Sequence, residues 1–210
     1  PKRSNYTSNG LDELTILNLK MQGAKIDVWG VGTKLITAYD QPALGAVYKL
    51  VSIADENGQM VDTMKISSNA EKVSTPGKKQ VWRITRKRDG KSEGDYIALW
   101  EEQPDQESEL YMFHPVFTYI NKTITDFEAR PILQDIIVEG KLVYELPSLQ
   151  EVKAFSEAQM SGLWDEYKRI LNPEDYPVDL SQKTYDHKMA TIKEIKKQIK
   201  EEASLLESTK

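Results

Sequence analysis

The first 45 residues alternate between short strand-like runs and helical runs. A polar segment over 4–8 leads through Asn9-Gly10 into a stretch with helical spacing of apolar residues. The apolar residues on that face are Leu14, Leu17 and Met21. Asn9 is a candidate N-cap with Asp12 in the capping-box position, and Gly23 is a candidate end of the helix. A second strand is predicted over 25–29, so the pattern favours two successive strand-then-helix units.

Strand patterns with strong turn signals follow from about residue 46. Asn57-Gly58 predicts a hairpin between strands near 46–53 and 60–67. Asp89-Gly90 predicts a second hairpin, with strands over 79–88 and 96–100. The pairing expected here is therefore antiparallel.

The last third of the chain has mostly helical periodicity. Ser148 and Glu151 form a capping-box pair, and Ser181 precedes a long amphipathic segment. The apolar stripe of that segment is Tyr185, Met189, Ile192, Ile195, Ile199, Ala203 and Leu206. We expect this stripe to pack in a core; a partner-binding coiled coil is the alternative. The sequence thus predicts an α/β plus α+β protein with parts 1–45 (βα units), 46–140 (β-rich) and 141–210 (helical).

Composition removes several function classes. The chain has 210 residues, no cysteine, two histidines, and 28 basic against 33 acidic residues, a formal charge of −5. A disulfide scaffold, a cysteine nucleophile and a three-histidine zinc site are therefore excluded. No apolar run approaches the ~20 residues of a membrane helix, and no secretory leader opens the chain, so the expected location is cytoplasmic, with no membrane partner. The mild acidity gives no overall attraction to nucleic acid.

Two loops are the best candidates for chemistry. Ser8-Asn9-Gly10 and Gly30-Val31-Gly32-Thr33 each follow a predicted strand, and both offer main-chain N–H groups and hydroxyls to an anion. If their strands are parallel neighbours, both loops leave the same sheet edge and can hold one phosphate. The alternative is that Gly-x-Gly is a tight turn. Leu35 stands where a dinucleotide fingerprint needs its third glycine, which disfavours that fold, and no P-loop is present.

Basic side chains give weaker candidates. Lys72, Lys78 and Lys79 surround Pro76-Gly77, and either this loop or Arg86-Lys87-Arg88 could face a polyphosphate or a nucleic acid. For the arginine run we favour a solvated hairpin end, which protects a sheet edge.

The two histidines are poor catalytic candidates. His114 lies between Phe113 and Pro115, a setting typical of a structural imidazole, and His187 falls off the apolar stripe of the last helix. We therefore predict no catalytic residue and no metal ligand in this chain.

Several motifs in order resemble the later part of nicotinate phosphoribosyltransferases, and the resemblance covers nearly the whole chain. The motifs are Thr7-Ser8-Asn9-Gly10-Leu11-Asp12-Glu13, Ile26-Asp27-Val28-Trp29-Gly30-Val31-Gly32-Thr33-Lys34, Gln41-Pro42-Ala43-Leu44-Gly45-Ala46-Val47-Tyr48-Lys49-Leu50-Val51, Lys72, Pro76-Gly77-Lys78-Lys79, Phe127-Glu128-Ala129-Arg130-Pro131, Glu145-Leu146-Pro147-Ser148-Leu149 and Arg169-Ile170-Leu171-Asn172-Pro173.

The resemblance implies a type II phosphoribosyltransferase. Such an enzyme joins nicotinate to phosphoribosyl pyrophosphate with magnesium and ATP hydrolysis, and releases nicotinate mononucleotide for NAD synthesis. It implies that Ser8, Asn9, Gly10, Gly30, Val31, Gly32 and Thr33 surround the ribose 5-phosphate, with Asp12 supporting the first loop. It also implies a homodimer in which Lys72, Lys78 and Lys79 could meet polyphosphate.

The family's phosphorylated histidine, nicotinate pocket and acidic magnesium segment have no match here. Two βα units do not close a barrel, and Pro1 is not an initiator methionine, so we expect the C-terminal portion of a longer enzyme with an incomplete barrel, binding no cofactor tightly and inactive alone. The alternatives are a stand-alone phosphate-binding or oligomerisation module, a nucleic-acid binder using Arg86 to Arg88, and a related enzyme that uses nicotinamide.

Overall fold

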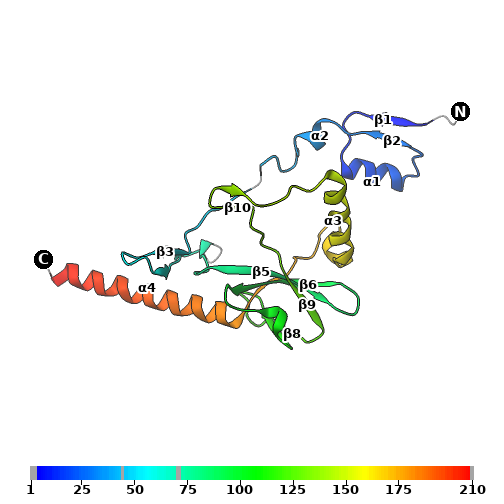
Figure 1. Cartoon of the computed structure of the whole chain (residues 1–210). Helices are drawn as coiled ribbons and strands as arrows, with labels where there is room; N and C mark the ends of the chain where they lie inside the picture. The colour runs from blue at the N-terminus through cyan, green and yellow to red at the C-terminus, as the bar shows by residue number, and fades with distance from the viewer. Residues whose placement is uncertain (1–3, 44, 70–71, 209–210) are drawn as a thin grey trace. The chain divides into compact units, whose positions relative to one another are not determined.

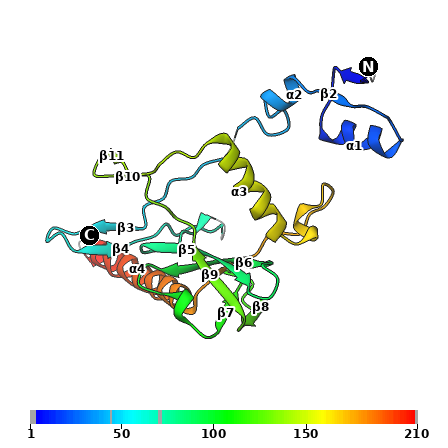
Figure 2. The same ribbon diagram turned by 45° about the vertical axis from the view of Figure 1, so that its right-hand side comes forward.

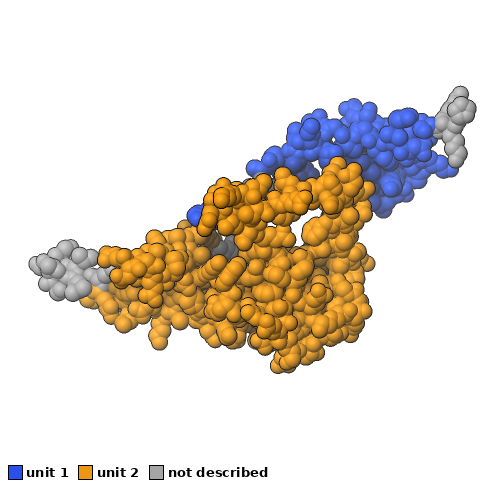
Figure 3. Space-filling view, in the orientation of Figure 1, with its two compact units in different colours: residues 1–48 blue, residues 49–210 orange. Residues whose placement is uncertain are grey.

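A computed structural model describes residues 4–43, 45–69 and 72–208, with the side chains of α4 described up to residue 201 and at 203–204. Pro1, Leu44 and the side chain of Leu206, which were named above, lie outside the described part. The chain divides into two compact units, residues 1–48 and 49–210, coloured separately in Figure 3.

The first unit consists of two strand-then-helix repeats. The strands β1 (Tyr6–Ser8) and β2 (Val28–Gly30) are parallel, and the helices α1 (Glu13–Met21) and α2 (Thr33–Ile36) follow them. The predicted βα order is therefore confirmed, although β2 begins later than expected. Leu11 is the one hydrophobic side chain of this unit that is buried among the described residues.

The ends of α1 were predicted unequally well. Asp12, and not Asn9, is the N-cap: its carboxylate accepts a hydrogen bond from the N–H of Thr15 at 2.7 Å. Asn9 cannot cap because it lies three residues before the helix, in the left-handed region with φ 81°. Gly23 ends the helix as expected. It has φ 81°, and its N–H and that of Ala24 reach back to the carbonyls of Lys20 and Leu19, closing the C-terminus.

A six-stranded mixed sheet organises the second unit (Figure 1). Its order is β8 (Asn121–Ile124), β7 (Leu110–Phe113), β12 (Val178–Leu180), β6 (Ser92–Leu99), β5 (Lys79–Arg86) and β9 (Phe127–Pro131). All neighbours are antiparallel except β12 and β6, which are parallel. A mixed α/β protein is thus the observed class.

The core lies on one face of this sheet. Alternate residues of its strands point into it: Trp82, Ile84, Tyr96, Ala98, Leu110, Met112, Phe127 and Ala129. Ile84, Ala98 and Met112 have no exposed surface. Because side chains alternate across a strand, the opposite face of β5 carries Arg83.

Tight turns and short elements complete the β part of the second unit. The Asn57-Gly58 turn joins β3 (Ser52–Ala54) to β4 (Met60–Asp62), which confirms the predicted hairpin, and Asp89-Gly90 joins β5 to β6 as predicted. A further hairpin pairs β10 (Ile137–Val138) with β11 (Lys141–Leu142). Two 3₁₀ turns, η2 (Pro104–Gln106) and η3 (Asp165–Lys168), are also present.

Two longer helices complete the unit, α3 (Leu149–Gly162) and α4 (Gln182–Ser208). The capping box of Ser148 and Glu151 is present as predicted, and the Ser181 hydroxyl accepts the N–H of Thr184 at 3.0 Å. Figure 2 shows α4 beside β3 and β4. The apolar stripe of α4 is half-buried at Tyr185, Ile192 and Ile195, but Ile199 is 57% exposed, so packing holds only the first part of the helix.

The three predicted parts combine differently in space. The strand β12 belongs to the range 141–210, yet it pairs with β6 and β7 from the range 46–140. These two ranges therefore contribute to one compact unit, residues 49–210. No local pattern indicates this arrangement, because three residues of strand pattern among helices do not identify a central strand.

Candidate functional site

The two candidate loops leave adjacent parallel strands at the same edge. Ser8, the last residue of β1, is the register partner of Gly30, the last residue of β2. The loops Ser8-Asn9-Gly10 and Gly30-Val31-Gly32-Thr33 therefore begin side by side. Carboxyl ends of neighbouring parallel strands are the usual place for ligands in α/β proteins.

Close approach at the strand ends requires glycine in β2. A Cβ atom on Gly30 would lie 2.9 Å from the Cβ of Ser8 and 3.4 Å from the carbonyl oxygen of Thr7. Any side chain at this position would push the two strands apart. Gly30 thus fixes the spacing between the loops.

The loop backbones are open to an incoming anion. Asn9 and Gly10 both adopt the left-handed conformation, with φ 81° and 64°, and they turn the chain sharply between β1 and α1. Within the described residues, the N–H groups of Gly10 and Gly32 donate to no acceptor of the protein. Successive donors in such turns form anion-binding concavities. Both loops are exposed, and no side chain fills the space at Gly10 or Gly32.

Asp12 braces the two loops from behind. Its carboxylate caps α1 through Thr15 and also accepts a hydrogen bond from the ammonium of Lys34 in α2. The Lys34 contact, followed by the Thr15 bond, holds the pKa of Asp12 well below its usual range. The pair thus stays ionised, and it ties the start of α1 to the helix that follows the second loop.

The three candidate lysines have different surroundings. The Lys79 ammonium donates to the carbonyl oxygens of Thr75 at 2.7 Å, Pro76 at 3.0 Å and Gly77, and burial lowers its pKa. It therefore holds the loop in shape. Lys78 lies 3.7 Å over the ring of Trp100 with its side chain exposed.

Lys72 is also exposed, and its carbonyl accepts a bond from the ammonium of Lys49 at 3.4 Å. Lys72 and Lys78 remain accessible to a polyphosphate, whereas the Lys79 ammonium is already engaged.

Gly77 holds the same loop against the rest of the second unit. It has φ 83°, and a Cβ there would lie 2.8 Å from Oδ2 of Asp62. That carboxylate oxygen also contacts Nε2 of His187 at 2.8 Å, joining β4 to α4. His187 therefore has a structural partner, which sequence spacing did not indicate.

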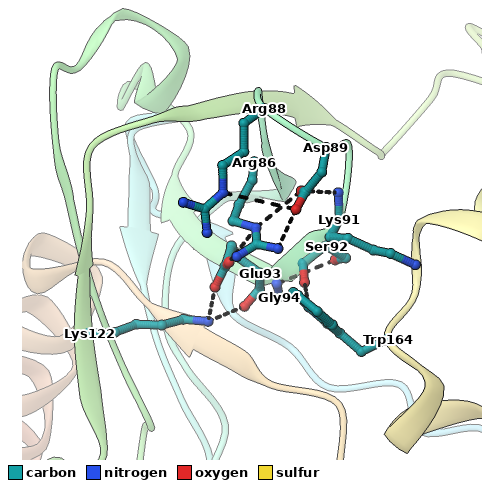
Figure 4. A network of polar contacts seen from close by, with 9 residues as sticks. All are labelled: Arg86, Arg88, Asp89, Lys91, Ser92, Glu93, Gly94, Lys122 and Trp164. Atoms are coloured by element: carbon teal, nitrogen blue, oxygen red, sulfur yellow. Dashed lines mark hydrogen bonds and ion pairs between the residues drawn. The ribbon is translucent and has the colours of Figure 1, made fainter.

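The arginine run differs from the solvated hairpin end that was expected. The side chain of Arg86 is only 18% exposed; it pairs with Asp89 and with Glu93, and its guanidinium lies 4.5 Å over the ring of Trp164 (Figure 4). Arg88 is 67% exposed, as predicted. The expectation failed at Arg86 because its guanidinium lies over Trp164, a residue more than 70 positions away that the local sequence does not indicate. A nucleic-acid site at this turn would lack Arg86.

His114 is a structural imidazole, as predicted. Its Nδ1 accepts the N–H groups of Val116 at 3.1 Å and Phe117 at 2.9 Å, and its ring stacks on Phe117 with centroids 5.0 Å apart. Two main-chain donors at Nδ1 place the proton of the neutral ring on Nε2.

Sequence reasoning missed a polar network on the non-core face of the sheet. Arg83 forms a bidentate ion pair with Asp95 at 2.9 and 3.1 Å, and Tyr176 bridges Asp95 to Ser92. The bond to Asp95 raises the pKa of Arg83. Arg83 also reaches Gln159 of α3 at 3.3 Å. The only sequence signal was a charged residue alternating with core residues of β5, and it did not specify the partners.

Comparison with known proteins gives the family. The family model described as nicotinate phosphoribosyltransferase C-terminal domain matches residues 78–188, more than half of the chain. The chain belongs to this family. The resemblance read from the motifs is thereby confirmed.

Individual relatives agree with this assignment. The chain is 57% identical over 195 residues to nicotinate phosphoribosyltransferase of Bacillus subtilis (strain 168), covering 93% of this chain and 40% of that protein. It is 32% identical over 176 residues to the human protein of the same name, covering 84% and 32%. The crystal structure of human nicotinic acid phosphoribosyltransferase superposes with a TM-score of 0.65 at 25% identity, over 91% of this chain and 33% of that one.

The chain therefore spans two fifths or less of the length of these curated relatives. The family match lies within the second unit, whereas both candidate loops lie in the first. No helix in the described residues combines the length and apolar character needed to cross a membrane.

Proposed function

We propose that this chain is part of a nicotinate phosphoribosyltransferase and supplies the loops that hold the 5-phosphate of phosphoribosyl pyrophosphate. The complete enzyme forms nicotinate mononucleotide from nicotinate, with ATP hydrolysis, in NAD biosynthesis. The family assignment supports the reaction, and the pairing of Ser8 with Gly30 supports the site.

The phosphate would lie between the two loops. Main-chain N–H groups at Gly10 and Gly32, with the hydroxyls of Ser8 and Thr33 and the amide of Asn9, form a donor set suited to a doubly charged ester. Val31 contributes its backbone between Gly30 and Gly32. These N–H, hydroxyl and amide donors carry no net charge. Selectivity for a phosphate therefore comes from the convergence of several donors on one anion.

On this proposal the strands β1 and β2 are units of a phosphoribosyltransferase α/β barrel, and the enzyme is a cytoplasmic homodimer. Two exposed lysines, Lys72 and Lys78, would face the polyphosphate of a substrate, and Lys79 would hold their loop. The phosphorylated histidine and the nicotinate pocket would come from sequence outside the shared two fifths. The structural hydrogen bonds of His114 and His187 support this assignment.

Magnesium does not fit the residues present. In the ranges that the structure describes, no group of three or more histidine, aspartate or glutamate side chains is placed to hold a metal ion. We therefore derive no step through magnesium or ATP from this chain.

The test is a substitution in the phosphate loop of the complete protein. Gly32→Val should raise the KM for phosphoribosyl pyrophosphate at least about tenfold in an assay of nicotinate mononucleotide formation, because a branched side chain would shield the loop donors. The KM for nicotinate should change little. The matched control is Gly45→Val, at a position where a Cβ also meets no atom within 4 Å. An unchanged KM for phosphoribosyl pyrophosphate would contradict the site.

A second candidate function is a phosphate-binding module without catalysis. Assays of residues 1–210 and of the complete protein distinguish this module from the enzyme. Residues 1–210 alone should form no nucleotide from nicotinate, phosphoribosyl pyrophosphate and ATP, because the catalytic groups are proposed to lie elsewhere. Turnover by this chain would contradict that division of roles. A complete protein that binds ribose 5-phosphate and forms no nucleotide would favour the module.

A further inference from the structure

An acidic hollow opens at the start of α4 in the second unit. Its volume is about 420 Å³, and its walls come from β6, the segment 101–111 and the first turn of α4. The hollow shares no lining residue with the phosphate loops or with the lysines around Pro76-Gly77. No role for it follows from the proposed reaction.

Carboxylates dominate the walls of this hollow. Four glutamates line it against one lysine, Lys183: Glu101, Glu102, Glu107 and Glu109. Glu102 is already satisfied, since its Oε2 accepts the N–H of Leu99 and the hydroxyl of Ser181, both at 2.7 Å. The other three are exposed, and none forms an ion pair with a described residue. An excess of negative charge therefore faces the hollow.

A buried tyrosine provides an independent observation. Tyr96 is 6% exposed and lines the hollow, and its hydroxyl forms no hydrogen bond with any described residue. Among the described residues, Nε1 of Trp82 is the side-chain polar atom that is fully enclosed and has no partner. The Tyr96 hydroxyl is therefore not fully enclosed, and it remains accessible from the hollow. Although the Tyr96 side chain is largely buried, its hydroxyl has no partner within the described protein, whereas polar groups of buried side chains normally have one. The hydroxyl thus marks a place where a ligand atom can bind.

The hydroxyl stays protonated under ordinary conditions. Burial, followed by the nearby charges of Glu102, Glu107 and Asp179, raises the pKa of Tyr96. A neutral phenol next to carboxylates presents its oxygen lone pairs to a donor. The missing partner is therefore expected to be cationic or strongly donating.

The arrangement favours an organic cation over a metal ion. No three acidic or histidine side chains in the described ranges come together closely enough to hold a metal ion. The lining that holds the carboxylates also includes Tyr111 and Leu110. Carboxylates that share a hollow with aromatic and aliphatic side chains match ammonium groups joined by methylene chains.

We propose that this hollow binds a linear aliphatic polyamine. One ammonium group donates to the Tyr96 hydroxyl and the others pair with Glu101, Glu107 and Glu109. Charge-assisted hydrogen bonds of this kind are stronger than neutral ones, and a methylene chain covers the aromatic wall of Tyr111.

The test is calorimetric titration of the protein with spermidine at fixed ionic strength. The unaltered protein should bind one spermidine saturably, and the double variant Glu107→Gln/Glu109→Gln should bind at least about tenfold more weakly, because two charge-assisted bonds are lost. The matched control, Glu56→Gln/Glu145→Gln, removes the same charge at exposed positions outside the hollow and should change affinity less than about twofold.

Tyr96→Phe separates a specific site from general attraction to acidic surface. This change keeps the ring and every charge, so a loss of about tenfold would show that the hydroxyl contacts the ligand. Thermal melts of each variant verify folding. The proposal is overturned by non-saturable binding, by equal weakening in the control double variant, or by magnesium displacing spermidine at equal concentration of charge. None of these outcomes depends on nucleotide formation.

Discussion

Gly30 is the residue at which strand pairing and the candidate phosphate site meet. Its hydrogen atom faces Ser8 at a distance that leaves no room for a methyl group. The contact between Gly30 and Ser8 therefore determines the distance between the starts of the two loops.

The first prediction concerns this contact. Gly30→Ala should destabilise the first unit by about 1–3 kcal/mol, the usual range for overpacking, and should weaken binding of ribose 5-phosphate. Denaturant unfolding and calorimetry measure the two effects. Gly45→Ala is the control, since a Cβ there meets nothing within 4 Å. Equal stability of Gly30→Ala and Gly45→Ala would show that the strands separate without cost.

A second prediction concerns Asp179 in β12. This side chain is 6% exposed, and burial raises its pKa, opposed mainly by the charge of Lys122. A raised pKa means that the folded protein binds the proton more tightly than the unfolded chain, so the contribution to stability is full at low pH and is lost as pH rises through the folded pKa.

Asp179→Asn should therefore stabilise the protein at pH 7, by less than about 1 kcal/mol because nearby cations and solvent offset the burial. The gain should disappear below about pH 4, where the aspartate is protonated in both states. Urea unfolding at the two pH values measures the difference. A gain of equal size at both pH values would assign the effect to packing instead.

At the scale of elements, the sequence correctly predicted turns and helix caps that depend on neighbouring residues. The hairpin at Asn57-Gly58, the turn at Asp89-Gly90 and the cap at Ser148 all follow from one or two residues that fix a backbone conformation. The contact of Arg86 with Trp164 and the pairing of β12 with β6 join residues more than 70 positions apart, and no local pattern encodes them.

The candidate site shows the same division. Two strand ends followed by small polar residues predicted loops at one sheet edge, and the parallel pairing of β1 with β2 agrees with that arrangement. The ion pair between Asp12 and Lys34 could not be predicted from the sequence, because the capping pattern alone favoured Asn9 as the N-cap.

A third prediction tests the start of α3. This helix has no buried residue, so its stability depends strongly on its ends. Ser148→Ala should lower its local stability by about 1 kcal/mol, because the N–H of Glu151 loses its acceptor. Hydrogen exchange of the α3 amides measures this loss. Ser156→Ala, at an exposed position inside the same helix, should have no such effect, and equal exchange in the two variants would contradict the capping role.

At the scale of the whole molecule, the two units differ in how much apolar surface they bury. Within the described residues the first unit buries Leu11 alone among its hydrophobic side chains, whereas the second encloses a continuous cluster around Ile84 and Met112. Hydrophobic burial is the main favourable contribution to folding, so the units should differ in stability.

The fourth prediction follows from this difference. In native-state hydrogen exchange with increasing urea, amides of β1, β2 and α1 should lose protection before those of β5 and β6. Saturating ribose 5-phosphate should delay loss in the first unit only, because a ligand stabilises the state that binds it. Simultaneous loss in both units would show that they unfold as one body.

The central position of β12 has a consequence for synthesis of the chain. In the order of the sheet, β7 with β8 and β6 with β5 and β9 meet only through residues 178–180. The ribosome synthesises these residues after all the others of that sheet. The two halves therefore keep unpaired N–H and C=O groups at their edges until the final strand is made. Any nascent fragment ending before residue 178 would expose two open ribbons. Protection of those edges during translation is therefore a requirement that this topology places on the cell.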